Sequence, residues 1–179
     1  MNKQFHAMMF AKEAHKNQTR RYTGDPYAIH LAEVAAYASA FGLDEDCVSA
    51  AWLHDCIEDQ GVSSSVILDR FGSKVAGIVL DLTDPPSTEN RAARKAMARQ
   101  RLGLASEETQ TIKVGDVLSN TASIVLHDPK FARVYLGECL QLVAALDKIP
   151  DQIRGLVESS LRENLSKLSI GFKSKEPSF

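Results

Sequence analysis

The sequence predicts an all-α protein, and three observations lead to this fold class. Apolar residues recur at helical spacing along nearly the whole chain, and no run alternates as a half-buried strand does. Glycine or proline stands at several points where the helical pattern breaks. A hydrophobic content of 44% over 179 residues is sufficient for one compact core. We therefore expect a single domain over residues 1–170, with a disordered tail over 171–179.

The expected helices follow one another along the chain, separated by short loops. Gly42 ends the second helix, and Asp44 can cap the third, near whose end His54 and Asp55 fall. The paired prolines at 85 and 86 end the fifth helix. In chain order, the expected spans are about 5–17, 27–41, 45–55, 66–72, 73–82, 90–102, 106–127, 129–147 and 150–168.

Charge, hydropathy and cysteine content exclude several functional classes. A formal net charge of -2 argues against broad nucleic-acid or anionic-membrane binding, because both need a large positive field. No run approaches the roughly 20 apolar residues of a membrane helix, and polar residues interrupt the N-terminal 17 residues, so no signal peptide is expected. Cys47, Cys56 and Cys139 are widely separated and form no CxxC pair. We therefore expect a cytoplasmic protein, whose oligomeric state the sequence does not indicate.

One segment of the chain, residues 91–101, is strongly basic. It holds no acidic residue, and its composition favours a helix. A solvated helix face is one interpretation of this segment, and a positive wall beside a phosphate site is the other. The basic side chains are Arg91, Arg94, Lys95, Arg99 and Arg101.

Side chains that can bind a metal or transfer a proton concentrate in three short segments. These are Tyr-Ala-Ile-His at 27–30, His-Asp-Cys-Ile-Glu-Asp at 54–59, and Lys-Val-Gly-Asp-Val-Leu-Ser-Asn at 113–120. Burying the polar groups of the second segment without an ion would cost on the order of several kcal/mol, so it is either exposed or binds something. In the third segment, Asp116 and Asn120 are four residues apart and share one helix face.

A His-Asp pair alone is weak support for a metal site. The chain contains a second pair, His127 and Asp128, directly before Pro129, where a helix end is the simpler interpretation. Adjacent residues on a helix also point about 100° apart. We therefore expect His54 and Asp55 to share an ion only where the helix geometry relaxes.

Taken in order, the three segments resemble the HD domain of the alarmone hydrolases, the RelA/SpoT family and its single-domain small relatives. The family pattern runs approximately Arg-Lys-x-x-Gly-x-Pro-Tyr-Ile-x-His-Pro, His-Asp-x-Ile-Glu-Asp and Lys-x-Ala-Asp-x-x-x-Asn. Here the matching residues are 20–31, 54–59 and 113–120, within a similarity that covers about 5–145. The resemblance implies an HD-domain helical bundle that hydrolyses (p)ppGpp at the 3′-pyrophosphate, giving GDP or GTP plus pyrophosphate.

The resemblance also implies the parts of an active site. It implies four ligands for a divalent metal, usually manganese in this family, and their nitrogen and oxygen donors suit such an ion. It implies two carboxylates beside the reacting water, and an arginine clamp that stacks on guanine and meets phosphates. The implied metal ligands are His30, His54, Asp55 and Asp116; the implied catalytic pair is Glu58 and Asp59; the implied substrate contacts are Arg20, Arg21, Lys113, Asn120 and Ser123. For Arg21 and Lys113, a solvated cation is the alternative.

Several departures from the family pattern leave the substrate open. Leu31 replaces the usual Pro, Gly115 replaces Ala, and Val117 with Ser119 replaces an Arg and a His. They alter the surroundings of Asp116 without removing a ligand. One alternative is the same chemistry on NADPH, a nucleoside monophosphate or a pyrophosphorylated tRNA end. Another is a non-catalytic alarmone-binding module. Because the sequence offers no synthetase or regulatory region, we expect hydrolysis only.

Overall fold

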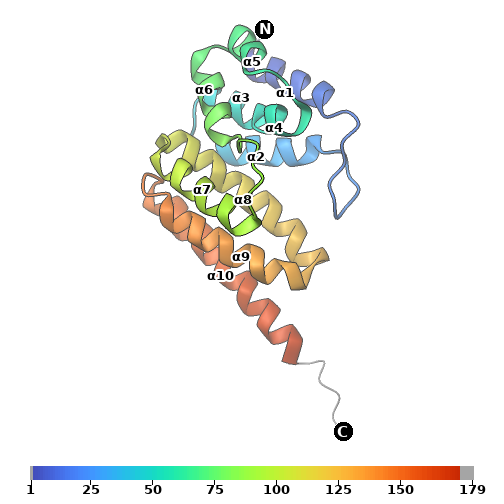
Figure 1. Cartoon of the computed structure of the whole chain (residues 1–179), viewed down its shortest axis with the longest axis vertical. Coiled ribbons are helices and arrows are strands. Elements are labelled where there is room, and N and C mark those ends of the chain that lie inside the picture. The colour runs from blue at the N-terminus through green and yellow to red at the C-terminus, as the bar shows by residue number, and fades with distance from the viewer. Residues whose placement is uncertain (1, 174–179) are drawn as a thin grey trace.

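The computed structural model describes residues 2–173, and these fold into helices with no strand among them (Figure 1). The all-α prediction is therefore confirmed. The helices are α1 (Lys3–Ala14), α2 (Ala28–Ala40), α3 (Glu45–Leu53), α4 (Cys56–Gln60), α5 (Ser64–Phe71), α6 (Ser73–Leu82), α7 (Arg91–Leu104), α8 (Glu107–His127), α9 (Pro129–Ala145) and α10 (Asp151–Lys173). Within this described part of the chain, no helix combines the length and the apolar character needed to cross a bilayer.

The predicted helix boundaries differ from the structure mainly at two places. Helix α3 ends at Leu53, and a five-residue helix that the sequence did not predict, α4, follows it. Gly61 ends α4 with φ 63°, a left-handed conformation that glycine adopts without strain. The last helix continues through residue 173, so 171–173 of the expected tail are helical. The rest of that tail, 174–179, lies outside the described residues.

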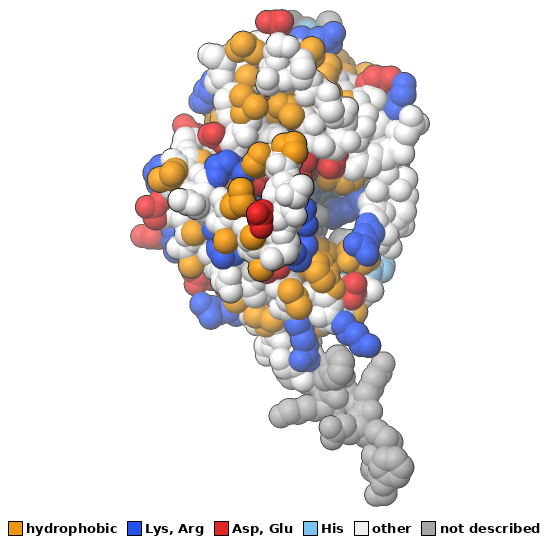
Figure 2. All heavy atoms as spheres, viewed as in Figure 1, with side chains coloured by type: hydrophobic (Ala, Val, Ile, Leu, Met, Phe, Trp, Pro, Cys, Tyr) orange, Lys and Arg blue, Asp and Glu red, His pale blue; other side chains and the backbone are white. Residues whose placement is uncertain are grey.

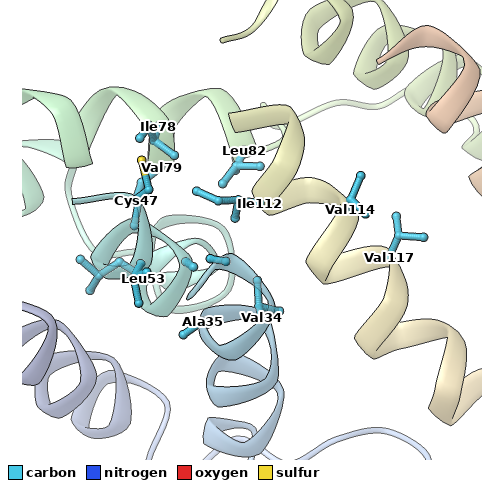
Figure 3. Close-up of a cluster of buried hydrophobic side chains, with 14 of the residues drawn as sticks. Val34, Ala35, Cys47, Leu53, Ile78, Val79, Leu82, Ile112, Val114 and Val117 are labelled. Carbon is cyan, nitrogen blue, oxygen red and sulfur yellow. The ribbon is translucent and has the colours of Figure 1, made fainter. Parts of the chain in front are cut away.

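Helix α8 is the element shared by the two ends of the molecule. Among the helices that precede α7 in the sequence, α2 packs against α3 and α8, while α1 and α6 cover α3. Among the later helices, α9 packs between α8 and α10, and α7 lies over α9 (Figure 1). Buried side chains of α2, α3, α6 and α8 converge in the core, among them Val34, Ala35, Leu53, Leu82 and Ile112 (Figure 3). This arrangement brings segments from both halves of the sequence into contact with α8.

Helix α2 lies close against α8 at Gly115. A Cβ atom at this position would lie 3.0 Å from the Cβ of Tyr37 and 3.5 Å from the carbonyl oxygen of Val34. A methyl group would therefore require Tyr37 to move by a few tenths of an ångström. The glycine that replaces the family's alanine thus has a packing reason in this chain.

Candidate metal centre and adjoining cavity

His54 and Asp55 occupy a two-residue break between α3 and α4. His54 keeps helical backbone angles, but Asp55 has φ -99° and ψ -1°, so the helix does not continue through the pair. The turn brings His54 Nε2 to 3.0 Å from Asp55 Oδ2. We expected His54 and Asp55 to share an ion only where the helix geometry relaxes, and this break provides such a place. It also explains why α4 exists as a separate short helix.

Four side chains from distant parts of the sequence converge at this break. His30 Nε2, on α2, lies 3.5 Å from Asp55 Oδ2 and 3.4 Å from Asp116 Oδ1, on α8. Ligand atoms of His30, His54 and Asp116 all lie within 4.8 Å of one another. The two imidazoles are almost fully buried, at 1% and 3% exposure. The packing of α2, α3 and α8 therefore assembles the four predicted ligands.

The hydrogen bonds of His54 determine which ring nitrogen faces the cluster. Its Nδ1 lies 2.8 Å from the carbonyl oxygen of Ala51, which can only accept, so Nδ1 carries the hydrogen. The Nε2 atoms of His54 and His30 are buried, and the groups they face are the carboxylates of Asp55 and Asp116. When these rings are neutral, two buried nitrogen lone pairs face two carboxylates, an arrangement that is costly alone and that suits a divalent cation. The donor set thus fits the metal that an HD domain implies.

Attraction between these imidazoles and carboxylates shifts their pKa values in opposite directions. Burial lowers the pKa of His30, but hydrogen bonding and charge from Asp116 and Asp55 outweigh it and raise the value to about 9. Burial opposes ionisation of Asp116, yet Lys113 and the two imidazoles bring its pKa below the usual range. The pKa of Asp55 is lowered by both imidazoles in the same way. Both carboxylates therefore stay ionised and available to a cation.

Neighbouring side chains orient the two carboxylates. Lys113 Nζ donates to Asp116 Oδ2 at 2.6 Å, and Asn120 Nδ2 donates to Asp116 Oδ1 at 2.6 Å. The Tyr27 hydroxyl donates to Asp55 Oδ2, also at 2.6 Å. Lys113, Asp116 and Asn120 share one face of α8, as their spacing predicts.

A cavity of about 240 Å³ opens beside the cluster. Asp55 and Asp116 lie in its wall, together with Tyr27, Lys113 and Asn120. The face drawn in Figure 2 is hollowed next to the segment that leads into α7, and acidic and basic side chains both border the hollow. A second cavity of about 330 Å³ adjoins the first and shares Glu58 and Asp84 with it. The site is thus open to a ligand larger than an ion.

Glu58 and Asp59, the predicted catalytic pair, both line the first cavity. Glu58 accepts the backbone N–H of Asp84 at 2.8 Å, and Asp59 accepts Gln18 Nε2 at 2.8 Å. Partial burial raises the pKa of Glu58; the Asp84 hydrogen bond lowers it, and the nearby charges of Asp84 and Asp55 raise it further. A carboxylate with a raised pKa beside a metal cluster is suited to accept a proton.

Some basic residues of α7 line the cavity, as a positive wall beside a phosphate site would, and others do not. Lys95 and Arg99 are partly buried in the cavity wall, and neither forms an ion pair within the described residues. Arg91 pairs with Glu138, and Arg101 pairs with Asp84. Arg94 lines only the adjoining cavity. Two cations of this segment therefore form a positive wall, and the others are occupied or exposed.

Three of the predicted substrate contacts lie outside the wall of the first cavity. Arg20 is 9% exposed and donates to Glu33 and to the backbone of Ser119, so its guanidinium faces the protein interior. Arg21 is exposed and lies over the ring of Tyr22. Ser123 lies on α8, one turn beyond Asn120. Only Lys113 and Asn120 of the predicted contacts reach this cavity.

The second His-Asp pair lies apart from the cluster. Asp128 caps α9 by accepting the backbone N–H of Phe131 at 3.1 Å. His127 is the last residue of α8, and its ring stacks on Tyr22. This pair therefore marks a helix end, as the position before Pro129 predicted.

Comparison with known proteins identifies the family to which this chain belongs. Residues 7–113 match the family model of the HD domain, which covers more than half of the chain. The protein therefore belongs to the HD-domain family.

Several curated relatives of this chain are alarmone enzymes by name. The guanosine-3′,5′-bis(diphosphate) 3′-pyrophosphohydrolase of Aquifex aeolicus is 30% identical over 142 residues, covering 78% of this chain and 20% of the relative. The enzyme of the same name from Vibrio cholerae is 31% identical over 141 residues, with 76% and 20% covered. The chain thus spans about a fifth of the length of these relatives. The resemblance inferred from the three segments is confirmed.

Solved structures share the fold. A metazoan SpoT ortholog described as hydrolysing ppGpp superposes with a TM-score of 0.77 at 24% identity, covering 94% of both chains. A structure from Listeria monocytogenes gives a TM-score of 0.61 at 24% identity, covering 79% of this chain and 99% of the other. At this identity the comparison establishes the helical architecture alone.

Proposed function

We propose that this protein hydrolyses (p)ppGpp, releasing the 3′-pyrophosphate as pyrophosphate and leaving GDP or GTP. Residues 1–170 act as one HD phosphohydrolase domain. The observation that carries the proposal is the cluster of four candidate ligands opening onto a cavity whose wall also holds Glu58, Asp59 and two cations without ion pairs in the described residues. The names of the curated relatives support the substrate. The cytoplasmic location expected from the sequence remains a prediction.

The metal ligands in this proposal are His30, His54, Asp55 and Asp116. A divalent ion held there supplies Lewis acidity toward a phosphoryl group and lowers the pKa of a coordinated water. Mn²⁺ is our choice because the donors are two nitrogens and two carboxylates, with no thiolate among them. Cys56 follows Asp55 directly but is buried in the core instead.

Glu58 and Asp59 carry the proton transfers. Glu58 accepts a proton from the attacking water, whose oxygen bonds to the phosphorus attached to the 3′-oxygen. The bond from that phosphorus to the 3′-oxygen breaks, and the 3′-oxygen takes up a proton as pyrophosphate leaves. Asp59 orients the water or assists the leaving group. The raised pKa of Glu58 supports its assignment as the base.

Lys95 and Arg99 bind the phosphates in this proposal, and Asn120 contacts the nucleoside. Lys113 adds positive charge at the cavity while it holds Asp116. Arg21 and Ser123 remain predicted contacts. We do not assign base stacking to Arg20, because its guanidinium is buried and bonded to Glu33.

The decisive experiment identifies the products. The Mn²⁺-loaded protein is incubated separately with ppGpp, ppApp, NADPH and GMP, and the products are separated by anion exchange. We expect GDP and pyrophosphate from ppGpp. Orthophosphate from ppGpp, or NADPH dephosphorylation with ppGpp inert, would favour another phosphoryl substrate. Tight ppGpp binding without any turnover would favour the binding module.

The phosphate wall is tested in the same assay. A charge-assisted hydrogen bond is worth roughly 1.5–3 kcal/mol, so Lys95→Ala and Arg99→Ala should each weaken ppGpp binding about tenfold or more. Lys167→Ala, an exposed cation of α10 paired with Glu163, is the control and should change nothing. Unchanged ppGpp binding in both cavity variants would show that the cations of α7 do not bind the substrate.

A further inference from the structure

We infer that Arg20, Glu33 and Ser119 form a positioning chain that holds His30 as a metal ligand. Arg20 donates from Nη1 to Glu33 Oε2 at 2.7 Å and from Nη2 to the carbonyl oxygen of Ser119 at 3.1 Å. The Ser119 hydroxyl donates to the same Glu33 oxygen and lies 2.7 Å from His30 Nδ1. The inference rests on the proposed metal site and is independent of which substrate is hydrolysed.

The direction of these hydrogen bonds follows from the donors available. An ionised carboxylate can only accept, so the single proton of the Ser119 hydroxyl points to Glu33. The oxygen of Ser119 then offers only lone pairs to His30, and Nδ1 must carry the hydrogen. His30 Nε2 is left with a lone pair directed at Asp55 and Asp116. A hydroxyl that donated to Nδ1 would instead place a hydrogen on Nε2, where the metal belongs.

Arg20 orients Glu33 by pairing with its carboxylate. The guanidinium is 9% exposed, and a buried cation of this kind requires a partner. Glu33, whose side chain is 43% exposed, supplies that partner. Arg20 therefore links the loop before α2 to both α2 and α8. In this chain the first arginine of the family-like motif acts on the metal cluster through two intermediaries.

Ser119 stands where the family pattern often has histidine, so the chain depends on a residue that departs from that pattern. A serine hydroxyl is short, and only the close packing of α2 on α8 brings it within reach of both Glu33 and His30. Such outer partners of a ligating histidine fix its orientation. We therefore treat Arg20, Glu33 and Ser119 as positioning residues rather than as substrate contacts.

The experiment measures Mn²⁺ affinity by electron paramagnetic resonance of the unbound ion. Ser119→Ala should weaken affinity roughly 10–100-fold, the usual effect of losing such a partner. Glu33→Gln should weaken it less, because the amide oxygen still accepts the Ser119 proton. The control is Thr111→Val, which removes another buried hydroxyl of α8 that has no partner. This variant should bind Mn²⁺ as the unaltered protein does.

A second readout reports on His30 directly. Nitrogen-15 resonances of the chelator-treated protein, recorded above the His30 pKa of about 9 where the ring is neutral, should show the hydrogen on His30 Nδ1, and Ser119→Ala should lose this preference. Unweakened Mn²⁺ affinity in Ser119→Ala would overturn the inference. If Ser119→Ala proves unstable, Glu33→Gln decides, since its side chain is 43% exposed and tolerates replacement.

The outcome also separates this inference from the proposed function. If the variants lose Mn²⁺ affinity to different degrees and the protein does not hydrolyse ppGpp, the positioning chain is supported and ppGpp is rejected as the substrate. Rapid ppGpp hydrolysis with equal Mn²⁺ affinity in all variants would overturn the positioning chain alone. A protein that binds no Mn²⁺ at all would overturn both.

Discussion

Asp116 is the residue on which most interactions of the cluster depend. It accepts hydrogen bonds from Lys113 and Asn120 and still presents an oxygen 3.4 Å from His30 Nε2. Asp116→Ala should therefore abolish both metal retention and turnover. Elemental analysis after Mn²⁺ loading and desalting measures the first effect. His127→Ala is the control, and a comparable loss there would mean that the wrong His-Asp pair has been chosen.

Replacing Glu58 and Asp59 should separate hydrolysis from the binding of metal and nucleotide. The double change Glu58→Gln with Asp59→Asn preserves shape, and the new amides can keep the contacts with Asp84 and Gln18. We expect Mn²⁺ and nucleotide to remain bound while the hydrolysis rate falls by ~10²–10⁴-fold, the usual contribution of a positioned acid or base. Rates like those of the unaltered protein would assign both residues a structural role.

The four candidate metal ligands could be selected from the sequence, but much of their surroundings could not. His30, His54, Asp55 and Asp116 stand in recognisable motifs, and the structure brings them together. Glu33 gave no sequence signal, because its partner Ser119 is 86 positions away. Arg20 was predicted from its motif as a base-stacking residue, and burial cannot be inferred from one arginine in a polar loop. Lys95 and Arg99 were visible as charge, but only the packing of α7 shows that they face the cavity.

At the scale of elements, the cap of α3 offers a test of local stability. Asp44 accepts the backbone N–H of Cys47, and Lys74 pairs with the same side chain. Asp44→Ala should cost about 1 kcal/mol, which corresponds to a fall in Tm of about 2–4 °C at pH 7. Asp69→Ala, at an exposed position on α5, should leave Tm nearly unchanged.

The loss in Asp44→Ala should depend on pH. The Lys74 ammonium and the Cys47 backbone N–H lower the pKa of Asp44 below its ordinary value of 3.8. The unfolded chain therefore takes up a proton at this site before the folded chain does. The stabilisation is present above pH 3.8 and is lost as pH falls through the lower folded pKa. Thermal melts that show the same gap between the two proteins at pH 7 and at strongly acidic pH would contradict this account.

Element boundaries were predictable where caps or breakers are strong, and less so elsewhere. Helix α6 has the predicted bounds, between Gly72 and the residues before Pro85. Helix α4 was missed because five residues are too few to show a helical period. The last helix continues past Leu168 and through Gly171, where the glycine predicted an end; Leu165 and Leu168 pack against the core in the turns before it.

At the scale of the whole molecule, a bound ion should act as a cross-link. The ligands come from α2, from the break after α3 and from α8, so unfolding must release the metal. At a free Mn²⁺ concentration of 100 times Kd, the stabilisation is about 2.7 kcal/mol, or a rise in Tm of roughly 5–10 °C. Scanning fluorimetry with Mn²⁺ and with chelator measures this shift. It should vanish in Asp116→Ala, and a shift that survives there would place the ion elsewhere.

Replacing a residue by the one most common in its family often stabilises a protein, but the packing of Tyr37 against Gly115 predicts the opposite here. Replacing Gly115 by the family's alanine adds about 1 kcal/mol of helix propensity, yet the new Cβ meets Tyr37 at 3.0 Å, and such overpacking costs about 1–3 kcal/mol. Gly115→Ala should therefore lower Tm, whereas Gly137→Ala, in open space on α9, should raise it. A higher Tm in Gly115→Ala would show that the two helices yield. The residue that is best on average in a family can thus be unfavourable in one member, because its partner on the facing helix has already taken the space.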